Sequence, residues 1–252
     1  TGEAIPQPHK SPVKGMSLPE AIEILRGPKG RTIELTIGRP GVSQPFEVTL
    51  VRDVIRVASV RERWLEPGYG YIRVAQFQNR TGDDVRKSLQ KLMDEQDLRG
   101  LVLDLRNNPG GILRASVDVA GLFMDGGLVV YTDGRLDHSD VSYDAEEIDA
   151  SGGVPLIVLI NAGSASASEI VAGALQDHGR AVVMGTPSFG KGSVQTILPI
   201  SDTRAVKLTT ALYFTPKGRS IQAEGIQPDI LVERAKVTRY EGRKQVVEKD
   251  LS

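Results

Sequence analysis

The sequence predicts an α/β fold, in which a core of alternating strands and helices follows a small β-rich unit. From Tyr69 onward, strand-like segments take turns with segments that have helical spacing. The runs Leu101–Leu105 and Leu156–Ile160 are apolar throughout, which is typical of strands buried on both faces of a sheet. Such an alternation indicates a core with much parallel sheet and helices packed against it.

The 252-residue chain is long enough for one large and one small domain. Changes in pattern divide it into a β-rich unit at residues 1–57, the α/β core at 58–232 and a charged tail at 233–252. The chain is 40% hydrophobic and 25% charged, as is ordinary for a globular protein. These proportions set no unusual constraint on the fold.

Charge and residue usage exclude several kinds of site. The net charge of −1 provides no basic surface for nucleic acid. The absence of cysteine excludes thiol nucleophiles, disulfides and thiolate metal sites, and the three scattered histidines lack the spacing of metal ligands. No apolar run reaches the 18 residues that a spanning helix needs. We therefore expect neither a metal nor another cofactor.

The first unit reads as one helix followed by two strands. Ser17-Leu18-Pro19-Glu20 has the spacing of a capping box, so a short helix is expected to begin there and to end at Gly27-Pro28. Alternating apolar and polar residues predict strands at 32–37 and 46–52, joined by a turn with Pro40-Gly41 at its centre.

The core is expected to begin with a strand at Tyr69–Val74 and a helix that starts at Thr81. Helical spacing places four apolar side chains on one face of that helix: Val85, Leu89, Leu92 and Met93. Beyond the two apolar strands, the pattern predicts a helix at 166–176 and further strands at 181–184, 193–199, 206–214 and 230–232.

A candidate nucleophile, Ser166, lies among small side chains where an apolar strand gives way to a helix. Small neighbours leave room for a substrate backbone, and a helix N-terminus favours developing negative charge. The spacing Ser166-x-x-Glu169 also fits a capping box, so a purely structural cap is the alternative. Ser164 and Ser168 carry the same chemical group, and chemistry alone does not exclude them.

A candidate base, Lys191, lies between two glycines with few other charges nearby. A lysine acts as a base only when neutral, and burial away from carboxylates lowers the pKa of a lysine. The nearest acidic residue in sequence is Asp202, so we expect Lys191 to be buried without a local carboxylate. In an extended segment, Lys191, Ser193 and Gln195 would face one side, where Gln195 could accept a hydrogen bond from the amine.

An oxyanion hole needs two convergent backbone donors. The N–H group of Ala167, the residue after the nucleophile, is one candidate. The second is expected from Asn107–Gly111, which follows a buried strand and contains glycines that permit close approach to a ligand. From the residues alone, a plain turn between strand and helix is the simpler interpretation of this segment.

Two other motifs are weaker. Gly185–Lys191 fits the start of a phosphate-binding loop, but Gly192 replaces the hydroxyl residue that binds magnesium, and a strand is predicted where a helix is required. A triad of Ser166 with Asp177 and His178 would need contact across a helix about 15 Å long. We expect His178 to cap that helix instead.

Three motifs together resemble those of the carboxy-terminal processing proteases, the serine peptidases of family S41. They are Leu103–Gly111, Ile170–Asp177 and Gly190–Gln195, and the similarity extends from about Gly2 to about Val232. The resemblance implies a ClpP/crotonase-like fold for the core. It also implies that the first unit is the second half of a PDZ domain, so that the chain begins within that domain and lacks its carboxylate-binding loop.

The resemblance assigns roles to the candidate residues. It implies Ser166 as nucleophile, Lys191 as base and Gln195 as third catalytic residue, with Gly111, or failing that Gly110, beside Ala167 in the oxyanion hole. The expected activity is endopeptidase cleavage near protein C-termini through an acyl-enzyme, in a bacterial periplasm or cell envelope. Substrates would be proteins or peptides with accessible C-termini. A homo-oligomer or a regulatory adaptor is compatible with this activity. The alternative is a non-catalytic peptide-binding or scaffold protein on the same fold.

Overall fold

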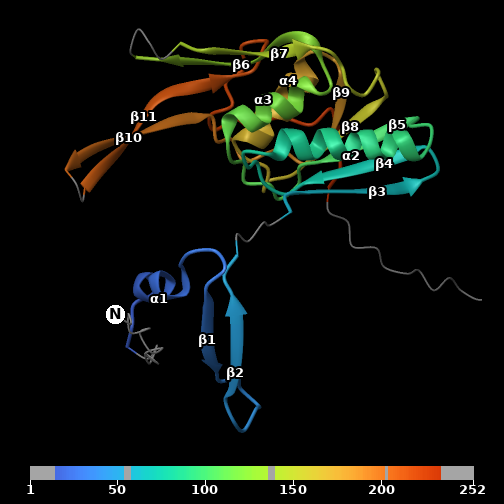
Figure 1. The fold of residues 1–252 in the computed structure, drawn as a ribbon. Helices are drawn as coiled ribbons and strands as arrows, with labels where there is room; N and C mark the ends of the chain where they lie inside the picture. The colour runs from blue at the N-terminus through green and yellow to red at the C-terminus, as the bar shows by residue number, and fades with distance from the viewer. Residues whose placement is uncertain (1–14, 54–57, 136–139, 202–203, 234–252) are drawn as a thin grey trace, which may run out of the picture. The chain divides into compact units, whose positions relative to one another are not determined.

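The structure is a computed structural model that describes residues 15–53, 58–135, 140–201 and 204–233. Internal contacts divide the chain into two compact units, Thr1–Val57 and Ala58–Ser252. Each unit is described by itself below, and Figure 1 shows the order of the elements along the chain. Nearly all of the expected tail lies outside the described residues. None of the described helices has the length and apolar composition needed to cross a membrane.

The first unit contains helix α1 (Leu18–Leu25) and the antiparallel strands β1 (Thr32–Ile37) and β2 (Phe46–Val51). Ser17 begins the helix, and both its N–H and its hydroxyl donate to the Glu20 carboxylate at 2.8 Å. The side chain of Arg52 donates to the carbonyl oxygens of Ile24 and Leu25 at 3.0 Å, which satisfies the C-terminal end of the helix. The predicted helix and strands are confirmed.

The second unit is built on a six-stranded sheet, which confirms the predicted α/β core. The strand order is β12-β9-β8-β5-β4-β3, and every pair is parallel except β3 with β4. The strands are β3 (Val60–Glu66), β4 (Tyr69–Val74), β5 (Gly100–Asp104), β8 (Leu156–Ile160), β9 (Ala181–Gly185) and β12 (Ile230–Leu231).

A second, antiparallel sheet has the order β10-β11-β6-β7 and was not expected as a sheet from the sequence. Its strands are β6 (Asp125–Gly134), β7 (Ser142–Glu147), β10 (Ser193–Ser201) and β11 (Arg204–Phe214). Helices α2 (Thr81–Glu95), α3 (Leu113–Gly121) and α4 (Ala167–Asp177) form a layer beside the six-stranded sheet (Figure 1). Helix α2 packs on β3, β4 and α3, whereas α3 and α4 also contact the antiparallel sheet through β6 and β7.

The buried core forms where these layers meet. Helix α2 contributes Val85, Leu89 and Leu92, as predicted, whereas Met93 is 37% exposed and the prediction for it is wrong. Met93 lies at the edge of the apolar stripe, one residue beyond Leu92. The apolar strands β5 and β8 lie in the middle of the sheet, between β9 and β4. Continuous apolar runs thus marked the central strands correctly.

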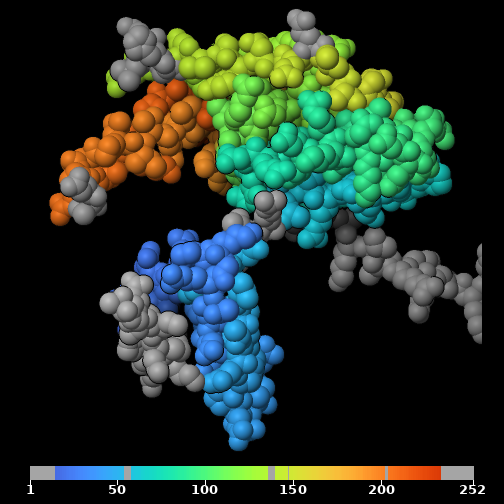
Figure 2. Space-filling view, viewed as in Figure 1, coloured from blue at the N-terminus to red at the C-terminus, as the bar shows by residue number. Residues whose placement is uncertain are grey.

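The hairpin of β10 and β11 has a different character, because much of its apolar surface is exposed. The space-filling view shows it standing clear of the rest of the second unit (Figure 2). Apolar residues on the hairpin that remain exposed are Ile197, Leu198, Ile200, Val206 and Leu208. An apolar run in the sequence therefore does not by itself establish burial here.

The parallel strands place three loops at one edge of the large sheet. Strands β5, β8 and β9 run in the same direction, so their carboxyl ends meet at that edge. The loops that follow them are 105–112, 161–166 and 186–192. These loops contain Gly111, Ser166 and Lys191, and in open α/β sheets this edge is the usual place for a ligand site.

Candidate active site

Ser166 occupies a strained turn between β8 and α4. Its φ of 57° and ψ of −114° are rare for a residue with a side chain. Backbone strain of this kind is concentrated at functional sites. Ser166 is the N-cap of α4 in a capping-box arrangement with Glu169, whose carboxylate accepts the Ser166 N–H, although the Ser166 hydroxyl makes no capping hydrogen bond.

The two neighbouring serines have structural partners. The Ser164 hydroxyl donates to the carbonyl of Leu105 at 2.8 Å and accepts the N–H of Asn161 at 3.0 Å. The Ser168 hydroxyl donates to the carbonyl of Asn108 at 2.9 Å. Both serines are fully buried, so Ser166 is the best candidate nucleophile of the three.

Glu169, in the first turn of α4, joins the nucleophile turn to the lysine loop. One carboxylate oxygen, Oε2, accepts the backbone N–H of Ser166 at 2.6 Å and that of Lys191 at 2.9 Å. The other, Oε1, accepts the Ser188 hydroxyl and the Gly190 N–H, each at 2.6 Å. Glu169 is fully buried, and all four partners are donors, as a carboxylate requires. The sequence showed this residue only as the last position of a capping box.

The expectation that Lys191 is buried is wrong, because its side chain is exposed. The flanking Gly190 and Gly192 take the buried positions, where their lack of a side chain lets residues 221–223 approach closely. The expectation of no nearby carboxylate is also wrong, since Glu169 binds the Lys191 backbone. Glu169 was not expected near Lys191, because the two residues lie 22 positions apart in the sequence.

Gln195 lies on β10 and is exposed. The pairing of β10 with β11 shifts register between Val194 and Gln195. Within the described part of the chain, no hydrogen bond joins the Lys191 amine to Ser166 or to Gln195. Catalytic hydrogen bonds are often long or misaligned in the absence of substrate and shorten when it binds.

The loop after β5 approaches the Ser166 turn directly. A Cβ on Gly110 would lie 2.6 Å from the Ala165 carbonyl oxygen and 2.8 Å from the Ser166 Cβ, so only glycine fits. Gly111 has a φ of 145°, and a Cβ there would meet the Phe77 carbonyl oxygen at 2.0 Å. Both expected glycines therefore have a steric reason to be glycine.

The expected oxyanion-hole donors have no acceptor within the protein. Among the residues that the structure describes, the N–H groups of Gly111 and Ala167 make no hydrogen bond, whereas Gly110 donates to the Asn108 side chain at 2.9 Å. The Ala165 N–H donates to the Asn108 carbonyl at 3.0 Å, which ties the two loops together. Gly111 is therefore a better candidate donor than Gly110.

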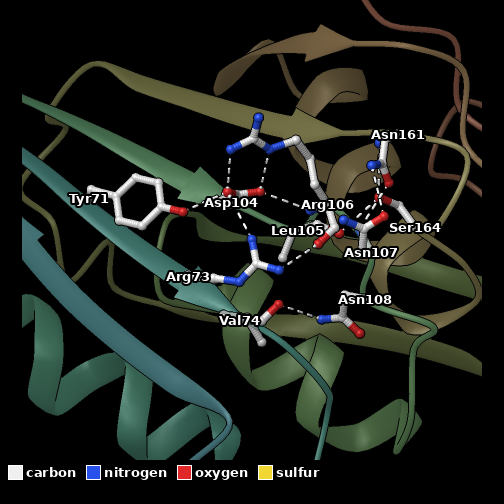
Figure 3. Close-up of polar contacts among 10 residues, drawn as sticks. All are labelled: Tyr71, Arg73, Val74, Asp104, Leu105, Arg106, Asn107, Asn108, Asn161 and Ser164. Atoms are coloured by element: carbon white, nitrogen blue, oxygen red, sulfur yellow. Dashed lines mark hydrogen bonds and ion pairs between the residues drawn. The ribbon is translucent and has the colours of Figure 1, made fainter. Parts of the chain in front are cut away.

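Two asparagines hold the start of the glycine loop. Asn107 donates its N–H to the Asn161 side chain at 2.9 Å, and its own side-chain oxygen accepts from Asn161 at 3.0 Å. The buried Asn108 donates to the carbonyl of Val74 at 2.9 Å. Figure 3 shows Asn107 facing Asn161 across the two loops.

A buried carboxylate, Asp104, is the last residue of β5 and anchors the start of the same loop (Figure 3). It accepts hydrogen bonds from the Tyr71 hydroxyl at 2.6 Å, from Arg73 at 3.2 Å and from the Arg106 guanidinium at 2.7 and 2.9 Å. The Arg106 backbone N–H also donates to it, at 2.9 Å. Burial opposes ionisation of Asp104, but the hydrogen bonds from Arg106 and Tyr71 outweigh it and lower the pKa of this carboxyl.

We expect Asp104→Asn to destabilise the second unit by about 2 kcal/mol at pH 7, because Arg73 and Arg106 lose a buried anionic partner. Those guanidinium groups are 34% and 46% exposed, so water replaces part of the interaction. Since the folded-state pKa of Asp104 is lowered, its stabilisation is complete above the unfolded value of about 4 and is lost as pH falls below it.

Urea unfolding at pH 7 and pH 3 measures this effect. The difference between Asp104→Asn and wild type should shrink at pH 3. Asp118→Asn is the matched control, because Asp118 pairs with Arg114 on the exposed face of α3 and should contribute under about 0.5 kcal/mol. Equal effects of the two substitutions would contradict the anchoring role.

The structure also argues against the Ser-His-Asp triad and the phosphate-binding loop. The ring nitrogen Nε2 of His178 lies 2.7 Å from the carbonyl oxygen of Leu128, and Asp177 pairs with Arg219. His178 is the C-cap of α4, as predicted, at the opposite end from Ser166. After Lys191 the chain continues as strand β10, so the helix of a phosphate-binding loop is absent.

Comparison with known proteins gives a consistent result. The model of peptidase family S41 matches residues 68–232. A carboxy-terminal-processing protease of Bartonella bacilliformis is 49% identical over 233 residues, covering 91% of this chain and 54% of that protein. A carboxyl-terminal-processing protease of Synechocystis sp. is 42% identical over 223 residues, covering 87% of this chain and 52% of that protein.

Among solved structures, the photosystem II D1 C-terminal processing protease matches with a TM-score of 0.64 and 34% identity. The match covers 89% of this chain and 61% of that one. This chain thus spans about half the length of the two relatives described above. The family match covers well over half of the chain and includes all three loops of the candidate site, so the chain belongs to peptidase family S41.

Proposed function

We propose that this chain carries the catalytic core of a serine endopeptidase that cleaves proteins near their carboxyl termini. The Ser166 hydroxyl oxygen attacks the scissile carbonyl carbon while the neutral Lys191 amine takes its proton. The N–H groups of Gly111 and Ala167 stabilise the oxyanion. Collapse of the tetrahedral intermediate expels the amine, which receives the proton from Lys191. Water then attacks the acyl-enzyme ester by the same route and regenerates Ser166.

One observation carries this proposal. The backbone N–H groups of Ser166 and Lys191 donate to the same oxygen of Glu169. Residues 25 positions apart in the sequence are thereby held around one buried atom. A strained serine whose hydroxyl makes no capping hydrogen bond and a lysine at such close backbone range support a Ser-Lys hydrolase.

Covalent labelling tests the proposal. A fluorophosphonate reacts with an activated serine, so the intact mass should rise by one adduct, and peptide mapping should place it on Ser166. A peptide substrate should give a transient acyl-enzyme at the same residue. Labelling of another serine would overturn the assignment.

A non-catalytic peptide-binding or scaffold protein is the second candidate. The observation that favours it is the exposed Lys191 side chain, which makes no hydrogen bond to Ser166 within the described residues. In that case peptides would bind, but neither an adduct nor cleavage would appear. The two functions therefore give opposite results in the same labelling experiment.

The setting of the activity is also a proposal. The relatives named as processing proteases include bacterial ones, which supports a periplasmic or cell-envelope location. The proposed chemistry implies protein or peptide substrates. A homo-oligomer or a regulatory adaptor is compatible with this activity. The β-rich first unit would act as part of a PDZ-like module that recognises or gates the substrate.

We expect Gln195→Ala to lower kcat/KM by about tenfold without abolishing activity, because Gln195 would orient the Lys191 amine and forms no bond to the substrate. Steady-state kinetics on one peptide measure this effect. A loss as complete as that of Lys191→Ala would assign Gln195 a chemical role. Wild-type rates would remove it from the site.

A further inference from the structure

The loop that carries Lys191 is held from a second side by residues 221–226. The Ala223 N–H donates to the Gly190 carbonyl at 2.9 Å, and the Ser188 N–H donates to the Ile226 carbonyl at 3.2 Å. The Ile226 N–H donates in turn to the Ser188 hydroxyl at 2.7 Å. The segment therefore contacts the loop at Ser188 and Gly190, and Ile226 also packs beside Gly173 of α4.

Gln222 is central to this contact. Its side-chain oxygen accepts the backbone N–H of Gly192 at 3.1 Å. With the two bonds from Glu169, three consecutive N–H groups at residues 190, 191 and 192 are bound by side-chain acceptors. Glu169 fixes the backbone before and at Lys191, and Gln222 fixes it immediately after.

The fit between loop and segment leaves little freedom. A Cβ on Gly192 would lie 2.3 Å from the Gln222 backbone nitrogen, and one on Gly190 would lie 2.9 Å from the Ala223 carbonyl carbon. Ala223 has a φ of 68°, which is unfavourable for a residue with a side chain. The surrounding contacts must offset that strain, so the position of the segment is strongly specified.

We propose that Gln222 is a positioning residue for Lys191, acting through the Gly192 backbone. This proposal rests on the Ser166-Lys191 chemistry proposed above. A lysine on an exposed loop has a flexible side chain, so the direction of its amine depends on how firmly the backbone at its root is held. Gln222 holds the N–H of Gly192, which Glu169 does not bind.

Three variants test the role. Gln222→Ala removes the acceptor, Gln222→Glu retains one at the same chain length, and Gln227→Ala is the matched control. The exposed Gln227 side chain donates to the Glu224 carbonyl in the same segment, and among the described residues it makes no hydrogen bond to the lysine loop. Steady-state kinetics are measured over a series of pH values, so that an effect of the added charge of Gln222→Glu on the base appears as a shift of the pH profile. Hydrogen exchange of the Gly192 amide is measured in parallel.

Gln222→Ala should lower kcat by about tenfold or more with KM within about twofold, because misplacement of a catalytic group affects the reaction rather than binding. The Gly192 amide should exchange faster, Gln222→Glu should recover most of kcat, and Gln227→Ala should match wild type. Unchanged kcat in Gln222→Ala would overturn the proposal, as would a rise in KM alone, which would make Gln222 a substrate contact.

Failure of this proposal can be separated from failure of the proposed function. If wild type does not cleave or label, or if Ser166→Ala remains active, the Ser-Lys chemistry fails. If wild type cleaves, Ser166→Ala does not, and Gln222→Ala equals wild type in kcat, only the positioning role fails. Unchanged Gly192 exchange in Gln222→Ala would reject the hydrogen bond itself, whatever the activity.

Discussion

Ser166→Ala is expected to abolish both peptide cleavage and fluorophosphonate labelling, while the stability of the second unit stays within about 1 kcal/mol of wild type. Loss of a nucleophile costs about a million-fold in kcat in a serine protease of the Ser-His-Asp type, so no turnover should be detectable. The stability effect is small because the Ser166 hydroxyl makes no capping hydrogen bond, and the Glu169 bond to the Ser166 N–H does not depend on the side chain. Product formation by mass spectrometry and urea unfolding measure the two effects.

Ser164→Ala gives the opposite pattern and serves as the control. Its hydroxyl is buried and bonded to both Leu105 and Asn161, so the substitution should cost about 1–3 kcal/mol of stability. Activity should remain at temperatures where the variant is folded. If Ser164→Ala were folded but inactive and Ser166→Ala cleaved normally, the nucleophile would be Ser164.

The sequence predicted the elements whose signal is local. Continuous apolar runs identified β5 and β8, and a capping box identified the start of α1. The antiparallel sheet was harder to predict, because β6 begins with Asp125-Gly126-Gly127 and has only the short apolar run Leu128–Tyr131, and because β7 is mostly polar. Helix α3 begins without a capping side chain, directly after Gly111 and Ile112, and no start signal marked it.

The candidate site was predictable in its residue types and not in its surroundings. Ser166 was identifiable from its small neighbours and Lys191 from its glycines, but the contacts that hold them are long-range. Glu169 reaches the lysine loop across 22 residues, and Gln222 reaches Gly192 across 30. Neither distance leaves a mark in local pattern, although Ser166-x-x-Glu169 did show that a carboxylate would lie near the turn.

The exposure of Lys191 was also not predictable from local sequence pattern. Glycines beside a lysine suggested close packing, and the packing exists, but it is the glycines that are packed. The side chain between them is left on the open side of the loop. A sequence shows which residues permit close approach and does not show from which direction the neighbour comes.

Lys191→Arg is expected to be as inactive as Lys191→Ala, which separates base catalysis from simple positive charge. Arginine keeps the charge and could still favour an oxyanion, but its guanidinium stays protonated in a folded protein and cannot accept the serine proton. The Glu169 bonds to the loop involve backbone N–H groups and remain available in both variants, so both should fold. The losses in kcat/KM should therefore be equal and large, at about a thousand-fold or more.

The pH dependence of the wild-type rate provides the second part of this test. Because only a deprotonated amine can take the proton from Ser166, kcat/KM should rise with pH. The variants should show no such rise. We would measure kcat/KM against pH for wild type, Lys191→Arg and Lys191→Ala, with thermal unfolding of each as the control for folding. Substantial activity in Lys191→Arg would make Lys191 an electrostatic element, and the base that activates Ser166 would then have to be a different group.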